Sequence, residues 1–420
     1  MVTRYPPHGT ARWLVYAVLV RLLITDIGRL WVGDGDVLTD AAVLFDGDRI
    51  GWVGSRVRAP AADEVTSCRG GLVTPGLVDA HAHPVYAGDR HAEIARRSAG
   101  AGYAEIATAG GGIAATVRDT RAAVDLRLAA SVRDRLRSWL RTGTTTVECK
   151  TGYHLTGAGE LAAVRLLAGL ADESDQPDLA RPYVTFLAAH AVPPEYAGRQ
   201  SEYAALCGQW TRPAAEAGAR GVDVFCDTGY FTVAEARAVL LAGRAAGLVP
   251  RVHADELART GGAMLAAELG AASADHLLRV TQDDARALAG AGVVATLCPL
   301  TGLQLRRQPP ARMLADAGVR LALGTDHNPG QCGSTSMSLV VAVAVAALGL
   351  TVAEALTAAT AGSAAALRLT DRGVVRVGAL ADLVWWDADH EGAFAWAFGL
   401  SPLRVWRGGQ PVERAASSLS

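Results

Sequence analysis

The sequence predicts an α/β protein: a (β/α)8 TIM-like barrel with a small composite β-sandwich domain formed by the N- and C-terminal segments. Three observations predict this fold. Short apolar, β-branched runs recur eight times, and each ends in polar residues. Helix start signals follow several of these runs, and hairpin signals occur near both ends of the chain. The expected divisions are an extension at 1–20, a β-domain from 21–74 plus 370–420, and a barrel at 75–369.

Length and composition set the limits of this prediction. The chain has 420 residues, half of them hydrophobic, with 40 Lys and Arg against 42 Asp and Glu. A net charge of -2 argues against a dedicated nucleic-acid-binding protein. The six cysteines include no Cys-x-x-Cys pair, which favours reduced thiols and a cytoplasmic location. The apolar run Trp13–Val20 is too short to span a bilayer, so no membrane partner is expected.

Eight continuous apolar runs fit strands that are buried on both faces, as the strands of a parallel barrel are. The predicted strands are Leu77–Ala82, Thr145–Lys150, Tyr183–His190, Gly221–Asp227, Val249–Asp255, Ala271–His276, Val293–Pro299 and Val319–Asp326. Helix start signals lie at 232–235, 281–284 and 351–354, and the apolar run Leu339–Leu350 suits a buried helix. Chemistry in such a barrel gathers at the carboxyl ends of the strands.

Both flanks of the predicted barrel contain short strands and turns. Asp-Gly and Gly-Asp pairs divide apolar runs within residues 22–58. Strands are also expected at Gly373–Arg376, Ala381–Trp386 and Leu403–Trp406. Neither flank is long enough to form a good core alone, so the two ends are expected to pair into one β-domain.

Histidines and carboxylates stand at the ends of the predicted strands. His81 and His83 end the first strand, and residues i and i+2 of a strand point to one side. The fifth run ends in His253-Ala-Asp-Glu256, the sixth in His276 and the eighth in Asp326. Any one of these could be a hydrogen-bonded core residue or a helix cap. Five at matching strand ends favour a common site.

Three imidazoles and one carboxylate suit one divalent metal ion, Zn²⁺ or Fe²⁺. The predicted ligands are His81, His83, His253 and Asp326. Such an ion lowers the pKa of a bound water to roughly 7, which provides a nucleophile near neutral pH. Glu256 and His276 are left for proton transfer and for support of the ligands.

This arrangement of histidines and aspartate resembles the amidohydrolase superfamily. The fourth strand ends at Asp227 without the lysine typical of dinuclear members, which implies the mononuclear branch, and Lys150 reads as a supporting or structural cation. Within the superfamily the chain is similar to the imidazolonepropionase family. The shared strings are Pro75-Gly-Leu-Val-Asp79, Tyr103-Ala-Glu-Ile106, Gly110-Gly-Gly-Ile113 with Thr116-Val117, Thr145-Thr-Val-Glu148, Lys150-Thr-Gly-Tyr153, Thr185-Phe-Leu187, Ala189-His-Ala191, Asp223-Val-Phe-Cys226, His253-Ala-Asp-Glu256, Ser273-Ala-Asp-His-Leu277 and Asn328-Pro-Gly330.

The resemblance implies a reaction, a substrate class and a set of contacts. The reaction is hydrolysis of the cyclic amide 4-imidazolone-5-propanoate to N-formimidoyl-L-glutamate in histidine degradation, and the family resemblance suggests a homodimer. Arg90 would hold the propionate through a bidentate pair, and His190 would donate to the imidazolone ring. The implied substrate-binding residues are Arg90, Tyr153, His190, Glu256, Asn328, Gly330 and Gln331.

The chain departs from the family pattern at three positions. His154 and Gln331 stand where the family more often has a Gly and a Ser, so contacts near Gln331 are open. Cys149 replaces a more usual aliphatic residue.

Catalytic roles are expected for Glu256, His276 and Asp326. His276 and the metal would stabilise the developing oxyanion, and Asp326 and Glu256 would move protons, with the identity of the general base left open. The alternative function is that of a related mononuclear aminohydrolase, a deaminase acting on a heterocyclic base. Arg90 and Tyr153 separate the two, because a neutral base needs no carboxylate clamp. A non-catalytic scaffold would predict eroded ligands, whereas all four are present.

Overall fold

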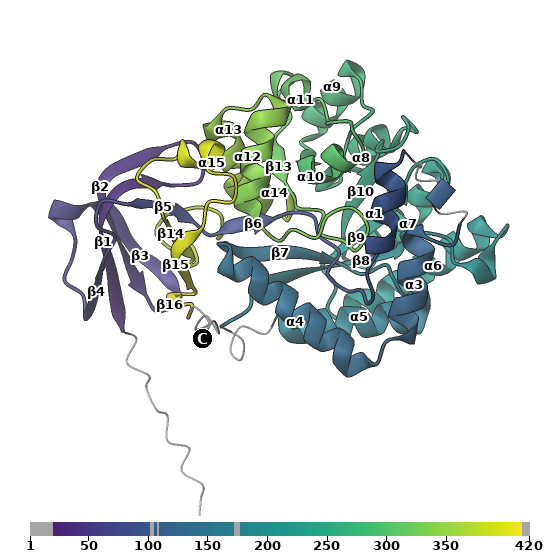
Figure 1. Ribbon diagram of the computed structural model, residues 1–420, viewed down its shortest axis with the longest axis horizontal. Helices are drawn as coiled ribbons and strands as arrows, with labels where there is room; N and C mark the ends of the chain where they lie inside the picture. The colour runs from purple at the N-terminus through teal and green to yellow at the C-terminus, as the bar shows by residue number, and fades with distance from the viewer. Residues whose placement is uncertain (1–19, 101–104, 107–108, 172–176, 414–420) are drawn as a thin grey trace, which may run out of the picture.

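The computed structural model describes residues 20–100, 105–106, 109–171 and 177–413. The predicted extension at 1–20 therefore lies outside the described residues, apart from Val20. Figure 1 shows two parts side by side: a barrel wrapped by helices, and a sheet to which both ends of the chain contribute.

The barrel contains eight parallel strands, paired in chain order from β6 to β13. All eight predicted strands are confirmed, with ends that differ by a few residues. The strands are β6 (Leu77–Asp79), β7 (Thr144–Lys150), β8 (Arg181–Ala189), β9 (Gly221–Cys226), β10 (Val249–Ala254), β11 (Ser273–His276), β12 (Val294–Leu297) and β13 (Leu321–Leu323). Every residue of β7, β8 and β9 is buried, as strands covered on both faces should be.

The barrel closes where its first strand meets its last. The Ala80 amide donates to the Leu323 carbonyl at 3.2 Å, and the Asp326 amide donates to the His81 carbonyl at 2.9 Å. A further parallel bridge joins Ala82 to His327. This seam brings the segment after β6 against the segment after β13.

Helices follow the barrel strands and cover the outside of the barrel, and the last short helix, α15, follows β14 of the terminal sheet (Figure 1). They are α1 (His91–Ser98), α3 (Gly112–Ala122), α4 (Asp125–Arg141), α5 (Gly157–Leu170), α6 (Gln200–Glu216), α7 (Val233–Ala245), α8 (Gly262–Leu269), α9 (Gln282–Ala291), α10 (Pro299–Gln304), α11 (Ala311–Asp316), α12 (Met337–Leu348), α13 (Val352–Thr357), the π-helical turn η3 (Ala358–Gly362), α14 (Ser363–Ala366) and α15 (Ala393–Trp396). Short 3-10 turns occur at η1 (Arg56–Arg58) and η2 (Pro194–Tyr196).

The predicted helix starts are confirmed by their capping contacts. Thr232, Thr281 and Thr351 each form a capping box with the acidic residue three positions later. The apolar run near 339–350 forms the largely buried helix α12. No helix in the described part of the chain is long and apolar enough to cross a membrane.

The terminal segments pair into one mixed sheet, as expected of a composite domain, and hydrogen bonding does not divide it into two separate sheets. Its strands are β1 (Arg21–Trp31), β2 (Val37–Asp46), β3 (Arg49–Ser55), β4 (Glu64–Ser67), β5 (Leu72–Pro75), β14 (Leu383–Trp386), β15 (Pro402–Arg407) and β16 (Gln410–Pro411). The antiparallel pair β14–β5 joins the two ends of the chain.

The strand expected at Gly373–Arg376 is wrong. Gly373 has a φ of 69°, and a Cβ there would lie 2.6 Å from the Thr360 carbonyl oxygen. The segment therefore turns against the barrel, and Val375 gives one amide hydrogen bond to the Val32 carbonyl instead of pairing along a strand.

Candidate active site

Four predicted metal ligands converge at the carboxyl end of the barrel. The Nε2 atom of His83 lies 3.2 Å from Nε2 of His81 and 3.4 Å from Nε2 of His253. Asp326 Oδ1 lies 3.5 Å from His83 Nε2 and 3.7 Å from His81 Nε2. All four side chains are buried. Strand order explains the meeting, because β6 and β13 adjoin at the seam and β10 lies across the barrel.

Two nearby carboxylates indicate which ring nitrogen of His81 and of His253 carries the proton. His81 Nδ1 lies 2.7 Å from Asp275 Oδ2, and His253 Nδ1 lies 2.9 Å from Asp223 Oδ2. A proton on Nδ1 leaves a lone pair on Nε2, so His81 and His253 both present a lone pair on the side where His83 Nε2 lies. Burial lowers the pKa of His81 and His83 well below the usual range, which favours neutral rings.

The four atoms fit a divalent metal ion. Zn–N bonds of about 2.0–2.1 Å place tetrahedral ligand nitrogens about 3.3–3.4 Å apart, close to the separations between these histidines. Neutral imidazoles that present lone pairs to one another have no hydrogen to share, so a cation satisfies them best. His81, His83, His253 and Asp326 could therefore hold one ion.

A buried group of charges lies beneath these ligands. Lys150 Nζ lies 2.7 Å from Asp223 Oδ2, 2.8 Å from Glu148 Oε1 and 3.4 Å from Asp275 Oδ2. Arg251 adds a second cation, 3.3 Å from Glu148 and 3.5 Å from Asp275. The carboxylates that orient His81 and His253 thus share one ammonium. This contact fits the supporting role predicted for Lys150.

An open pocket lies beside the predicted ligands His83, His253 and Asp326, and it encloses about 470 Å³ of empty space when the solvent at its mouth is included. Its wall includes His276 and most of the residues predicted to bind substrate. These lining residues are Arg90, Tyr153, His190, Glu256, Asn328 and Gln331. His154 and Cys149 do not line it, so two of the three departures lie outside the cavity.

Comparison with known proteins identifies the family. The Amidohydrolase family profile matches residues 251–412. The imidazolonepropionase of Rhodococcus jostii is 46% identical over 397 residues, covering 92% of this chain and 94% of the relative. That of Mycolicibacterium smegmatis is 44% identical over 404 residues, covering 94% and 98%. The chain belongs to the imidazolonepropionase family. As a family member it is a hydrolase with a metal-dependent amidohydrolase site.

Solved structures support the imidazolonepropionase fold more distantly. A zinc-bound adenosine deaminase from Xanthomonas campestris has a TM-score of 0.71 at 22% identity, covering 93% of this chain and 92% of that protein. A Xaa-Pro dipeptidase has a TM-score of 0.69 at 18% identity, covering 94% and 100%. At these identities the likeness shows the fold alone.

The Arg90 side chain lines the imidazolonepropionase cavity and is held in place by Glu93. Its Nε and Nη2 donate to the two oxygens of Glu93 at 2.9 and 2.7 Å, and the Gly112 amide donates to the same carboxylate at 2.8 Å. Gly330 packs on the guanidinium, since a Cβ there would lie 2.1 Å from Nη1. Glu93 thus fixes the plane of Arg90, and a side chain at position 330 would displace it.

His190 presents a defined face to the cavity. Its ring stacks on His83, with centroids 5.1 Å apart and planes 18° apart. Its Nδ1 lies 3.0 Å from the Gly152 carbonyl oxygen and therefore donates to it. Burial lowers the pKa of His190 to about 3, so the ring is neutral. Nε2 then carries a lone pair, whereas the sequence predicted that His190 donates to the substrate ring.

Glu256 and His276 lie together at the edge of the cavity. Glu256 Oε1 is 3.9 Å from His276 Nδ1. Burial raises the pKa of Glu256 well above its usual range, and the charges of Asp326 and Asp227 add to this effect. The Asp227 carboxylate accepts the backbone amides of residues 256–258 at 2.8–3.0 Å and so holds the loop that carries Glu256.

Backbone strain gathers at this end of the imidazolonepropionase barrel. Asp255, His276, Leu277 and Asp326 have positive φ values of 50–72°. Such conformations are costly for residues with a Cβ and cluster at functional sites.

Sequence reasoning missed several residues that support the site. Glu93, Asp223 and Asp275 carry no predicted role, although each contacts a predicted site residue. The contact of Glu93 with Arg90 could have been predicted, because Glu93 follows Arg90 by three residues at the start of a helix. Asp223 and Asp275 stand inside motifs already singled out, but their partners come from other strands. Tyr103, in another of these motifs, lies outside the described residues.

Proposed function

We propose that the chain hydrolyses 4-imidazolone-5-propanoate to N-formimidoyl-L-glutamate by opening the cyclic amide. One observation carries this proposal: three of the four proposed metal ligands, His83, His253 and Asp326, line the same pocket as the guanidinium of Arg90. An ion held by these ligands would activate water, and the guanidinium would bind the carboxylate of a small anionic substrate. The names of the curated relatives agree with this substrate class.

His81, His83, His253 and Asp326 would hold one Zn²⁺ or Fe²⁺. When bound, such an ion lowers the pKa of water to about 7 and polarises a carbonyl group. His81 is kept in the required tautomer by Asp275, and His253 by Asp223.

The substrate would be oriented by three side chains. Arg90, held by Glu93, would pair with the propionate. His190 would accept an N–H of the imidazolone ring at Nε2, because its Nδ1 proton is committed to the Gly152 carbonyl. Tyr153 would contact the ring from the same wall as His190, since their ring centroids lie 5.1 Å apart. Asn328 and Gln331 would complete the wall around the ligand, and Gly330 would pack against the Arg90 guanidinium.

The remaining groups would stabilise charge and move protons. His276 is neutral, since burial lowers its pKa to about 3, and it would donate an N–H to the oxygen that gains charge. Asp326 or Glu256 would take the proton from the attacking water. That proton would then pass to the ring nitrogen as the C–N bond breaks.

A turnover assay tests the proposal. Purified, metal-quantified protein is mixed with 4-imidazolone-5-propanoate, and the ultraviolet absorbance of the substrate is followed. Metal-dependent loss of absorbance with N-formimidoyl-L-glutamate as product is expected. A folded, metal-loaded protein without turnover would overturn the substrate assignment, and a screen of aminated heterocycles and other cyclic amides would follow.

Arg90→Met should raise KM about 10- to 150-fold, because it removes charge-assisted hydrogen bonds to the propionate. Methionine keeps a long side chain that can still fill the wall. The measurement is KM and kcat with the carboxylate substrate. An unchanged KM would mean that no substrate carboxylate meets Arg90, which would favour a deaminase acting on a neutral base.

Glu93→Gln should raise KM about 10-fold with little change in kcat, because the amide cannot accept both N–H groups of Arg90. The double variant Arg90→Met/Glu93→Gln should be no worse than Arg90→Met alone, since Glu93 acts through Arg90. Additive losses in this cycle would contradict the positioning role. Steady-state kinetics of the four proteins measure it.

We also propose a cytoplasmic location and a homodimer. All six cysteines are buried and none forms a disulfide, which supports a reducing compartment. The dimer rests on the family resemblance, and light scattering of the purified protein tests it.

A further inference from the structure

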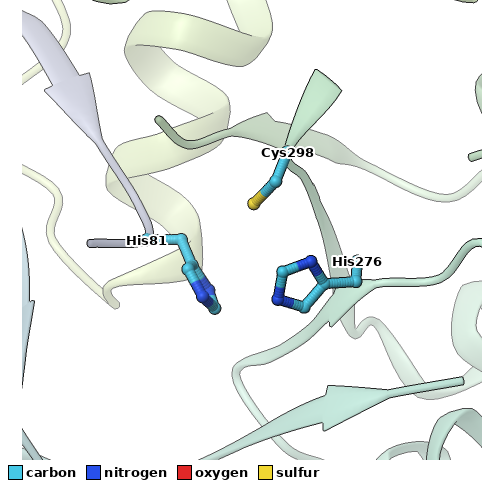
Figure 2. A group of neighbouring side chains, drawn as sticks. All are labelled: His81, His276 and Cys298. Atoms are coloured by element: carbon cyan, nitrogen blue, oxygen red, sulfur yellow. The ribbon is translucent and has the colours of Figure 1, made fainter. Parts of the chain in front are cut away.

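Cys298 lies beside the proposed metal site without a role in it. It follows β12, the seventh barrel strand, and its side chain is fully buried. Figure 2 shows its sulfur directed toward the space between the rings of His81 and His276. One potential ligand atom from each of these three residues lies within 4.8 Å of the other two.

The described residues contain two such groups, and both include His81. The other group is His81, His83 and His253, which belong to the site proposed above. His81 Nδ1 is engaged by Asp275 at 2.7 Å, so only Nε2 remains to bind an ion. An ion held by one group therefore competes with an ion held by the other.

His276 provides an independent indication of a ligand. Its side chain is 2% exposed, and its Nδ1 has no hydrogen-bond partner within the described residues. The nearest carboxylate oxygen, on Glu256, is 3.9 Å away. Buried ring nitrogens are nearly always satisfied, so an unsatisfied one in a cavity wall points to a group that binds there.

The donor set selects the kind of ion. Sulfur and imidazole nitrogen favour soft or borderline cations, whereas carboxylate and water favour hard ones. We propose that His81, His276 and Cys298 form a second, thiophilic cation position that overlaps the resident metal site and binds soft divalent ions such as Cd²⁺. The Cys298 thiol gives its proton to solvent as the sulfur–metal bond forms, and no electrons are transferred.

Occupation of this position has two consequences. It takes Nε2 of His81 from the resident ion, and it engages the imidazole proposed to stabilise the oxyanion. Soft cations should therefore inhibit the enzyme by competition with the resident metal rather than with substrate. This consequence rests on the proposed function, whereas binding itself does not.

Cadmium titration tests the binding without any substrate. Metal-free protein is titrated with Cd²⁺ while the ultraviolet thiolate-to-cadmium absorption and the bound stoichiometry are recorded. One Cd²⁺ per chain with a thiolate band is expected. Cys298→Ala should lose the band, and Cd²⁺ should bind at least about 10-fold more weakly, since loss of an outer-shell partner alone costs about that much. Cys68→Ala, which removes a buried thiol packed beside the terminal sheet, should retain both.

Several results would overturn the proposal. They are Cd²⁺ binding without a thiolate band, a band that persists in Cys298→Ala, or two ions per chain. If Cys298→Ala does not fold, Cys298→Ser provides the same test, because serine keeps the volume and lacks the sulfur. A thiolate band in a protein that fails the turnover assay would support this position and reject only the substrate.

Discussion

Replacement of Asp326 by asparagine should lower kcat/KM by about 10²–10⁴-fold and reduce the bound metal. Asn has nearly the same shape but carries no charge. Oδ1 of Asp326 faces Nε2 of His83 at 3.5 Å and Nε2 of His81 at 3.7 Å, so the substitution removes the anionic ligand from the group. The measurement is metal content of the purified variant together with its steady-state kinetics.

Thr301→Val is the matched control for this variant. Thr301 donates to the other carboxylate oxygen of Asp326 at 2.6 Å, and valine removes that hydrogen bond while the charge stays. The control should keep its metal and lose less activity than the asparagine variant. An Asp326→Asn protein that retains full metal and full turnover would remove Asp326 from both of its proposed roles.

Glu256→Gln should lower kcat by about 10²–10⁴-fold and leave metal content unchanged. Glu256 lines the cavity but is not one of the four proposed metal ligands. Burial and two nearby carboxylates raise the pKa of Glu256 above the usual carboxyl range, which makes its protonated form easier to reach and suits a group that carries a proton. Gln keeps the size and hydrogen-bonding capacity but cannot carry the proton.

Glu93→Gln serves as the comparison for Glu256→Gln, because both exchange a buried glutamate of the same site for its amide. The Glu93 variant should change mainly KM and the Glu256 variant mainly kcat. An unaltered kcat for Glu256→Gln would exclude it from proton transfer and leave Asp326 as the general base.

The barrel could be predicted because its signals are local. Runs such as Thr145–Lys150 are apolar throughout, and the positions of His81, His83 and Asp326 follow from where such runs end. The family resemblance added Arg90, Tyr153 and His190, which line the same pocket as the proposed metal ligands His83, His253 and Asp326.

The missed features depend on contacts between distant segments. Asp275 orients His81 from another strand, and nothing near either residue in the sequence predicts the contact between the two side chains. The strand predicted at Gly373–Arg376 is wrong because Gly373 adopts a positive φ and lies close to the Thr360 carbonyl, a contact between segments that the local sequence does not indicate. The tautomer of His190 likewise depends on the Gly152 carbonyl, which only the folded chain brings to its Nδ1.

The position of the proposed metal ligands at the seam of the barrel has a consequence for stability. His81 and His83 follow the first strand and Asp326 follows the last, so a bound ion would fasten the two edges of the sheet across their junction. A bound ion would link chain segments that are far apart in sequence, where loop closure is costly in entropy. Its contribution to folding grows as RT ln(1 + [L]/Kd) with the free concentration of metal. With an ion bound in this way, the resistance of the barrel to unfolding would depend on the metal supply of its surroundings.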